Sequence, residues 1–189
     1  YCRTWELANQ RSYFAASEGR STTDAVWRQA VTAQVAVNKG QHAVSVLWDI
    51  SKFYEMISHR LLAGRARKHG FPMAILRVNL RMYKAPRYIS LRGMVSKALC
   101  PVQGVVAGCP MATTHVKVYT IEDLDSFILR NPVVQLDLFV DDFVTAAQGT
   151  AVEVIEAVGA AAGDLAECIG DSFKCQIALD KAAVVASSD

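Results

Sequence analysis

The sequence predicts a mixed α/β (α+β) fold, because short apolar strands alternate with longer segments of helical periodicity. Residues 133–140 and 143–147 are apolar runs on either side of Asp141 and Asp142, which predicts a β-hairpin with both carboxylates at its tip. Another compact apolar run, at 43–48, predicts a further strand. With 52% hydrophobic and 20% charged residues, the 189-residue chain can bury a substantial core, as one domain or as one large and one partial domain.

Capping residues and periodicity define the expected helices. Ser21 or Thr22 precedes the first, Pro72 opens the third, and Thr150 with Glu153 forms a capping box for the last. We expect helices over residues 23–37, 60–69, from 72 onward, 112–129 and 150–169. Additional strands are expected over residues 87–92, 176–179 and 182–186, whereas residues 1–20 are of mixed character.

Composition narrows the classes of function. The net charge of +2 neither requires nor excludes a nucleic-acid partner, because local patches matter more than the total. The five cysteines form no Cys-x-x-Cys, so we expect no disulfide framework or zinc site, and an intracellular location. The longest uncharged run, 98–116, contains two prolines and a histidine, so no membrane partner is expected. Because the chain begins at Tyr1, we expect a fragment of a longer polypeptide.

Three acids stand at the ends of expected strands. Asp49 directly follows the strand at 43–48, and sheets commonly place their sites where strands end. Buried carboxylates are costly unless they are paired or bound to a metal. A hairpin tip that displays Asp141 and Asp142 suits a divalent cation held by oxygen ligands. The alternative is that these two residues only form a turn, which Asp favours.

Two further segments allow both a functional and a structural interpretation. Arg60, Arg65, Arg67 and Lys68 make a basic helix face that either contacts phosphates or is simply solvated. Residues 104–110 form a glycine-rich turn before a helix, where exposed backbone can receive a phosphate or a nucleotide edge. A tight turn without a ligand fits the same residues.

In this order the motifs resemble those of reverse transcriptases, closest to the non-long-terminal-repeat retrotransposon and group II intron branch. Residues 49–55 (Asp-Ile-Ser-Lys-Phe-Tyr-Glu) are similar to the family's Asp-hydrophobic-Ser-Lys-Ala-Phe-Asp motif. Residues 104–111 look like its Gly-Val-Arg-Gln-Gly-Cys-Pro-Leu loop, and 139–142 (Phe-Val-Asp-Asp) match its aromatic-x-Asp-Asp. Residues 19–25 are similar to a Gly-Arg-Ser-Thr-x-Asp-Ala segment, and Lys181 follows a long helix as the family's lysine does.

The resemblance implies a polymerase palm in which an antiparallel sheet packs on helices, together with part of the fingers. Residues 1–40 would be partial fingers or a lead-in helix, and residues 41–189 the palm, with the thumb absent. The implied activity is that of an RNA-directed DNA polymerase of a retroelement. Its partners would be an RNA template, a DNA primer and deoxynucleoside triphosphates, and its location nuclear if the host is eukaryotic. The oligomeric state is not indicated.

The resemblance also implies a set of site residues. Asp49, Asp141 and Asp142 would hold two Mg²⁺ or Mn²⁺ ions for nucleotidyl transfer, with the Ile50 carbonyl completing the shell. Lys181 would neutralise or protonate the leaving pyrophosphate as a general acid, although it also fits a surface lysine.

The incoming nucleotide would meet two further parts of the chain. Tyr54, five residues after the first acid, would be the steric gate against ribonucleotides, or else a core tyrosine. Gly108, Cys109 and Pro110 would form the substrate-binding loop.

Several positions depart from the family pattern. Val106 and Ala107 stand where the loop normally carries Arg-Gln, so the loop is expected to bind nucleotide more weakly. Glu55 replaces the usual Asp and Phe53 a small residue. These departures keep two alternatives open: a degenerate non-catalytic remnant, and a palm-type RNA-directed RNA polymerase, in which residue 54 tends to be an acid.

Overall fold

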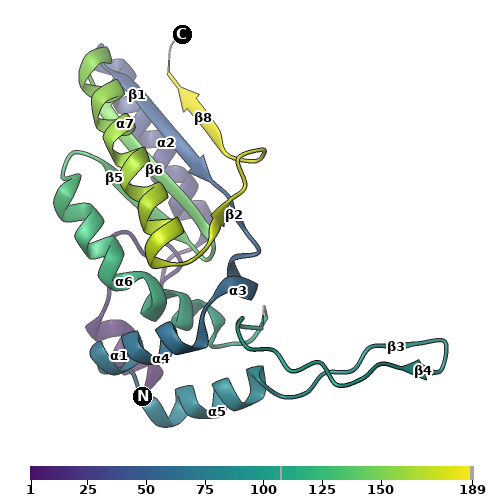
Figure 1. The fold of residues 1–189 in the computed structure, drawn as a ribbon. Helices are drawn as coiled ribbons and strands as arrows, with labels where there is room; N and C mark the ends of the chain where they lie inside the picture. Colours follow the sequence, from purple (N-terminus) through teal and green to yellow (C-terminus); the bar gives the residue numbers. More distant parts are fainter. Residues whose placement is uncertain (107, 188–189) are drawn as a thin grey trace.

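A four-stranded antiparallel sheet forms one end of the molecule in the computed structural model, which describes residues 1–106 and 108–187 (Figure 1). In spatial order its strands are β5 (Gln135–Phe139), β6 (Asp142–Gly149), β1 (His42–Trp48) and β8 (Ala183–Ala186). The expected hairpin at 133–147 is therefore confirmed as β5–β6. The expected strand at 43–48 is β1, which pairs with β6 along its whole length.

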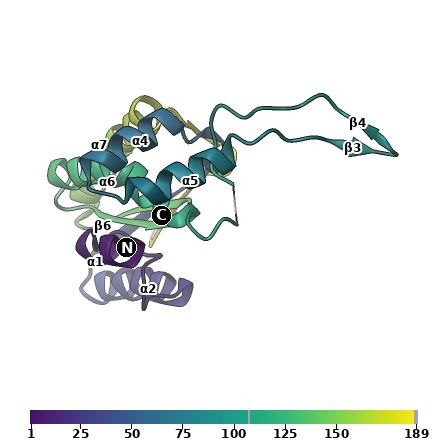
Figure 2. The same ribbon diagram turned by 90° about the horizontal axis from the view of Figure 1, so that it is seen from below.

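Two helices cover opposite faces of this sheet (Figures 1 and 2). α7 (Ala151–Glu167) lies on one face and α2 (Thr22–Asn38) on the other. Both begin with a capping box, in which the N-cap hydroxyl and the carboxylate three residues later each accept a backbone N–H. α7 buries an apolar stripe, whereas α2 buries only Ala36 and leaves Trp27 64% exposed.

The other end of the molecule is helical and is built around α6 (Ala112–Arg130). This helix is buried through most of its length, because α4 packs directly against it and α5 packs against α4. The remaining helices of this end are α1 (Cys2–Ala8), α3 (Phe53–Met56), α4 (His59–Lys68) and α5 (Met73–Tyr83). Ser58 caps α4, and Pro72 precedes α5 as the sequence predicts.

An aromatic cluster joins the sheet to the helical end. Phe143 of β6 lies 6.0 Å from Phe53 of α3 and 6.2 Å from Phe173, measured between ring centroids. All three side chains are buried in the same hydrophobic core. Large buried aromatics contribute strongly to stability, so this cluster fixes the acid-bearing strands relative to α3.

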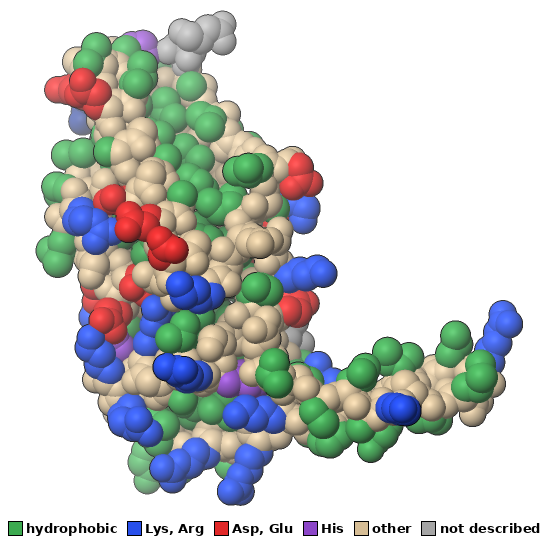
Figure 3. Space-filling model, in the orientation of Figure 1, with side chains coloured by type: hydrophobic (Ala, Val, Ile, Leu, Met, Phe, Trp, Pro, Cys, Tyr) green, Lys and Arg blue, Asp and Glu red, His purple; other side chains and the backbone are tan. Residues whose placement is uncertain are grey.

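A long arm projects from the helical end between α5 and α6 (Figures 1 and 2). Its tip is the two-stranded hairpin of β3 (Ser90–Leu91) and β4 (Met94–Val95). Residues 84–100 are exposed throughout, including the apolar side chains of Ile89 and Met94, and the space-filling view shows the arm standing away from the body (Figure 3). Two-stranded hairpins are marginally stable alone, so the arm has little core of its own.

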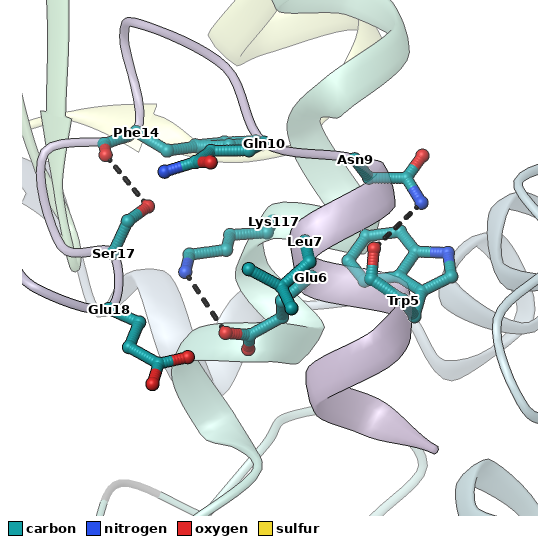
Figure 4. Close-up of a pocket in the computed structure, with 9 residues that line it drawn as sticks. All are labelled: Trp5, Glu6, Leu7, Asn9, Gln10, Phe14, Ser17, Glu18 and Lys117. Carbon is teal, nitrogen blue, oxygen red and sulfur yellow. Dashed lines mark hydrogen bonds and ion pairs between the residues drawn. The ribbon is translucent and has the colours of Figure 1, made fainter.

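The N-terminal helix α1 is held against α6 by a buried ion pair (Figure 4). The amine of Lys117, on α6, lies 3.6 Å from a carboxylate oxygen of Glu6 and 5.9 Å from the centroid of the Phe14 ring. Glu6 also accepts a hydrogen bond from the hydroxyl of Thr114. Lys117 is only 6% exposed, so its charge is compensated inside the protein, where an unpaired amine would be costly.

Some local expectations are corrected. The expected strand at 87–92 reduces to Ser90–Leu91, because the alternating residues project into solvent and meet no second layer. The expected helix at 150–169 ends as an α-helix at Glu167 and continues as a π-helix, Cys168–Ser172. The expected strand at 176–179 shortens to β7 (Gln176–Ile177), which pairs with β2 (Ile50–Ser51) outside the main sheet. α1 was not expected, and the division at residue 40 stays a prediction.

Candidate active site

The register of β1 and β6 brings the predicted acids to one edge of the sheet. Trp48, the last residue of β1, pairs with Phe143 of β6, so Asp49 and Asp142 are the next residues in the same register. A hydrogen bond of 3.0 Å from the Trp48 indole to the Thr145 hydroxyl fixes this end of the pair. Asp49 and Asp142 are therefore neighbours through strand pairing, although they are far apart in sequence.

The hairpin tip has an unusual backbone conformation. Phe139 pairs with Asp142, which leaves Val140 and Asp141 as a two-residue loop. Val140 has φ 62°, a left-handed conformation that a β-branched residue rarely adopts. Two-residue loops commonly place a glycine where φ is positive, so the valine marks local strain at the point where the carboxylates are displayed.

The carboxylates at the tip interact electrostatically. The pKa of Asp142 is raised above its usual range, first by partial burial and then by the negative charges of Asp141 and Asp49. The amine of Lys181 lies 3.6 Å from Asp49 Oδ2. This lysine, 63% exposed at its side chain, forms an ion pair with Asp49.

Lys181 is positioned by a backbone link to the acid that it faces. The carbonyl of Asp49 accepts a 2.9 Å hydrogen bond from the N–H of Ala178. The carbonyl of Ala178 in turn accepts from the N–H of Lys181 at 3.0 Å. Ile50, the next residue of the chain, is buried and pairs with Ile177. The predicted lysine, the first acid and Ile50 thus belong to one small unit.

Tyr54 reaches the same edge from α3. Its pKa is raised, first by burial and then by the charge of Asp141, and its hydroxyl interacts with the hydroxyl of Thr113 at the start of α6. Phe53 beside it is buried, with 2% exposure, and belongs to the core. The half-buried Tyr54, and not Phe53, is therefore the ring that faces the acids.

The first half of the glycine-rich loop lies on α3. The N–H of Gly104 donates to the carbonyl of Ile57 at 2.8 Å, and the N–H of Val105 donates to that of Tyr54 at 2.7 Å. Gly104 has φ 93°, and a Cβ there would lie 3.0 Å from the carbonyl oxygen of Glu55. A side chain at position 104 would therefore push the loop away from α3.

The second half of the glycine-rich loop is held by a network of polar side chains that begins at Tyr83. The Tyr83 hydroxyl lies 3.1 Å from Cys109 Sγ and 3.2 Å from Nδ1 of His115. Asn79 lies 3.3 Å from the other ring nitrogen of His115. Burial lowers the pKa of His115 to about 4, so the imidazole is neutral at physiological pH. No local pattern in the sequence predicts this network, because its members come from two helices and the loop between them.

The remaining loop residues are less constrained. Gly108 and Pro110 are exposed and make no hydrogen bond to the acids within residues 1–106 and 108–187. Gly108 has φ 85° and open space around its Cα. Ala107, where the family pattern has a glutamine, lies outside the described residues, so the expected weakening of the loop stays a prediction.

A cavity of about 330 Å³ opens between the acid edge and α2. Asp49, Asp142 and Lys181 line one side of it, and Val26 and Gln29 of α2 line the other. No pattern in the sequence predicts that α2 lies across the cavity from the acids.

The carboxylates have the right chemistry for Mg²⁺ or Mn²⁺, which prefer oxygen ligands. Within the described part of the chain, however, no group of three or more His, Cys, Asp or Glu side chains is gathered closely enough to enclose a metal ion. The carboxylates therefore suit a divalent cation by the type of their donor atoms and by lying near one another. The side chains would have to turn toward one another for a cation to be bound.

Solved structures share this arrangement of sheet and helices. The chain matches apo telomerase from Candida tropicalis, truncated from the C-terminal domain, with a TM-score of 0.70 and 13% identity over 100% of this chain and 40% of that one. Telomerase from Candida albicans, in complex with the TWJ fragment of telomeric RNA, matches with a TM-score of 0.68 and 14% identity, over 97% of this chain and 34% of that one.

The predicted mixed α/β fold with an antiparallel sheet is thus confirmed, and the likeness concerns the fold alone. The chain spans well under half of each telomerase. No protein-family model and no curated protein matches the sequence. The retrotransposon or group II intron branch stays a prediction. Among the described helices, none has the length and apolar character needed to cross a bilayer.

Proposed function

We propose that the chain is the palm of an RNA-directed DNA polymerase from a retroelement. The observation that carries the proposal is the meeting of Asp49, Asp141 and Asp142 at one edge of the sheet, in a fold like that of telomerase. Like charges held side by side raise the free energy of the folded protein unless a counter-charge joins them. A carboxylate such as that of Asp142, whose pKa is raised and which lines a cavity, is a common mark of a functional site.

The acids would act by holding cations and substrate in a fixed geometry. Bound Mg²⁺ or Mn²⁺ ions would activate the primer 3′-hydroxyl and stabilise the charge on the leaving pyrophosphate. Asp49 and Asp142 sit on neighbouring strands, so the sheet limits their movement. Asp141 stands at the strained tip, and the Ile50 carbonyl would complete the ligand set.

Lys181 is suited to the leaving-group side of the reaction. Its amine is near Asp49 yet largely exposed, so it can turn toward a pyrophosphate. There it would neutralise negative charge or donate a proton. Gly108, Cys109 and Pro110 would border the nucleotide, with Cys109 held in place by the Tyr83 hydroxyl.

Primer extension on an RNA template with a DNA primer, deoxynucleotides and Mn²⁺ tests the proposal. Asp141→Asn should lower the rate by about two orders of magnitude or more, since a lost metal ligand removes several kcal/mol of transition-state stabilisation. Asp171→Asn changes an exposed acid that does not line the cavity and serves as the matched control. Equal rates in the two variants would contradict the proposal.

Tyr54 would select deoxynucleotides, because a ring packed beneath the sugar leaves no room for a 2′-hydroxyl. Overpacking of this kind costs about 1–3 kcal/mol, or roughly one to two orders of magnitude in selectivity. Tyr54→Ala should lower the ratio of kcat/KM for deoxy- over ribonucleotide by that amount. Tyr54→Phe keeps the ring and should retain the ratio.

The two alternatives give distinct results in these assays. A wild-type preference for ribonucleotides would favour an RNA-directed RNA polymerase. A non-catalytic remnant is favoured by the lack of a tight ligand group in the described residues. It would show neither extension nor Mn²⁺ binding by calorimetry.

A further inference from the structure

One continuous stretch of the chain carries positive charge without any acid. Between residues 56 and 121 there are eleven Lys or Arg residues and no Asp or Glu. This stretch forms α4, α5, the arm, the glycine-rich loop and most of α6. The near-neutral total charge of the protein conceals this local imbalance.

Only a minority of these basic groups is compensated by acids from other segments. Arg65 pairs with Asp123 at 2.7 Å, Lys68 with Glu122 at 2.5 Å and Lys117 with Glu6 at 3.6 Å. The others are exposed and make no ion pair within the described residues. They are Arg60, Arg67, Arg77, Arg81, Lys84, Arg87, Arg92 and Lys97.

The unpaired groups form an ordered row. Arg77, Arg81 and Lys84 are four and three residues apart, so they share one face at the end of α5. Arg60 and Arg67, seven residues apart, share a face of α4, which packs against α5. The arm extends the row from the end of α5 through Arg87 to its tip. Lys and Arg side chains gather over this end of the molecule and recur along the arm (Figure 3).

We infer that this surface, formed by the exposed basic residues of α4, α5 and the arm, binds the phosphate backbone of a nucleic acid outside the acid edge. The inference goes beyond the proposed polymerisation, since binding here needs no metal and no nucleotide. Six of the eight groups are arginines, whose planar fork matches phosphate oxygens. A row of separated charges fits a linear polyanion better than it fits a single phosphate.

Nucleic acid is favoured over a lipid surface by where the charges lie. The fully buried Leu62 and Leu76 direct the main apolar stripes of α4 and α5 toward the core, and the large apolar side chains exposed on α5 are limited to Val78 and Met82. A membrane-surface helix would instead present its apolar face outward beside the charges. On the arm, exposed Tyr88 and Ile89 lie between basic residues, where they can contact bases or sugars.

The test measures binding of a fluorescein-labelled single-stranded RNA by anisotropy, in EDTA and without nucleotides. The first variant combines Arg77→Gln, Arg81→Gln and Lys84→Gln. Each lost phosphate contact should reduce the slope of log K against log salt by roughly 0.7, and three should weaken binding about tenfold or more at low salt. A variant with Arg60→Gln and Arg67→Gln should show a smaller loss of the same kind.

The control removes two charges elsewhere, with Lys39→Gln and Lys174→Gln, which matches the α4 variant in number, and should retain the wild-type slope. Because all these residues are exposed, every variant should keep the wild-type melting temperature. Equal losses in the α5 variant and the control, or no loss in either, would overturn the inference. So would tighter binding to phosphatidylserine vesicles than to RNA, if the α5 variant abolished it.

These outcomes are independent of catalysis. Asp141→Asn should bind the RNA at least as well as wild type, because it removes a negative charge and no basic group. Loss of extension with intact RNA binding would count against the proposed polymerase alone.

Discussion

The two ends of the molecule differ in charge and in packing. The sheet end displays carboxylates on paired strands that are covered by helices, with Phe143 beneath them fully buried. Between residues 56 and 121 the helical end carries Lys and Arg but no Asp or Glu, and it extends into an arm with little core of its own. The difference teaches that one chain can keep its exposed acids and its exposed bases on separate surfaces while its total charge stays near zero.

The largest expected effect concerns packing beneath the acids. Phe143→Ala should lower the free energy of unfolding by about 3–5 kcal/mol, because it leaves a cavity between Phe53 and Phe173. Urea denaturation measures the loss. Phe139→Ala, at a half-buried position on the neighbouring strand, is the control and should cost clearly less. Similar losses would mean that the aromatic cluster is not the anchor of the sheet end.

The next effect concerns the neutral histidine within the basic end. Burial lowers the pKa of His115 to about 4. Between about pH 6.5 and pH 4 the imidazole is therefore protonated in the unfolded chain but neutral in the folded chain. Stability from this residue is present above its unfolded pKa and is lost as the pH falls. Between pH 7 and pH 5 the loss should be about 2 kcal/mol.

Denaturant titrations at both pH values test this dependence. His115→Gln should show a smaller difference between the two pH values than wild type, because it removes the group whose protonation opposes folding. An unchanged difference in His115→Gln would show that other groups dominate the acid sensitivity.

A smaller effect is expected at the edge where positive charge meets the acids. Lys181→Met removes the amine beside Asp49 and with it the repulsion of an incoming cation. Because the pair is largely exposed, calorimetry should show Mn²⁺ affinity rising only about two- to fivefold. Primer extension should fall in the same variant if the lysine serves the leaving group. Lys174→Met, another exposed lysine, should leave the affinity as it is.

The smallest effect is expected on the arm. Leu91→Ser should change the free energy of unfolding by no more than about 0.5 kcal/mol, because the side chain is already 67% exposed. Leu76→Ala, at a fully buried position of α5, is the contrasting control, expected to cost about 2–5 kcal/mol. A loss above 1 kcal/mol in Leu91→Ser would show that the arm packs on a surface and is not free.

Local signals were enough to predict much of the fold. The capping boxes at Ser21 and Thr150, the proline before α5 and the hairpin around Asp141 each depend on a few neighbouring residues. In the exposed arm the same reasoning predicted too long a strand, because an alternating pattern favours a strand only where one face of it is buried. α1 has no capping side chain and no acidic residue in its first turn, so no local pattern predicted it.

The candidate site was predictable only as a set of residues. Motif order pointed to Asp49, Tyr54, Asp142 and Lys181, and the structure brings them to one edge. Which residues support them depends on tertiary packing: Thr113 beside Tyr54, the pairing of Ala178 with Asp49, and the Tyr83–His115 network beneath Cys109. None of these contacts has a periodicity or a short spacing that could be read from the chain.

The link through Ala178 has a consequence for how this segment can vary. The N–H of Ala178 donates to the carbonyl of Asp49, and the carbonyl of Ala178 accepts from the N–H of Lys181. These two hydrogen bonds hold Lys181 near Asp49. A one-residue insertion or deletion between Ile177 and Lys181 would disrupt the turn that the hydrogen bond from Lys181 to Ala178 closes, and would displace the amine from Asp49. Substitutions at the exposed Leu179 or Asp180 would leave that spacing intact. The segment is therefore expected to accept changes of sequence more readily than changes of length.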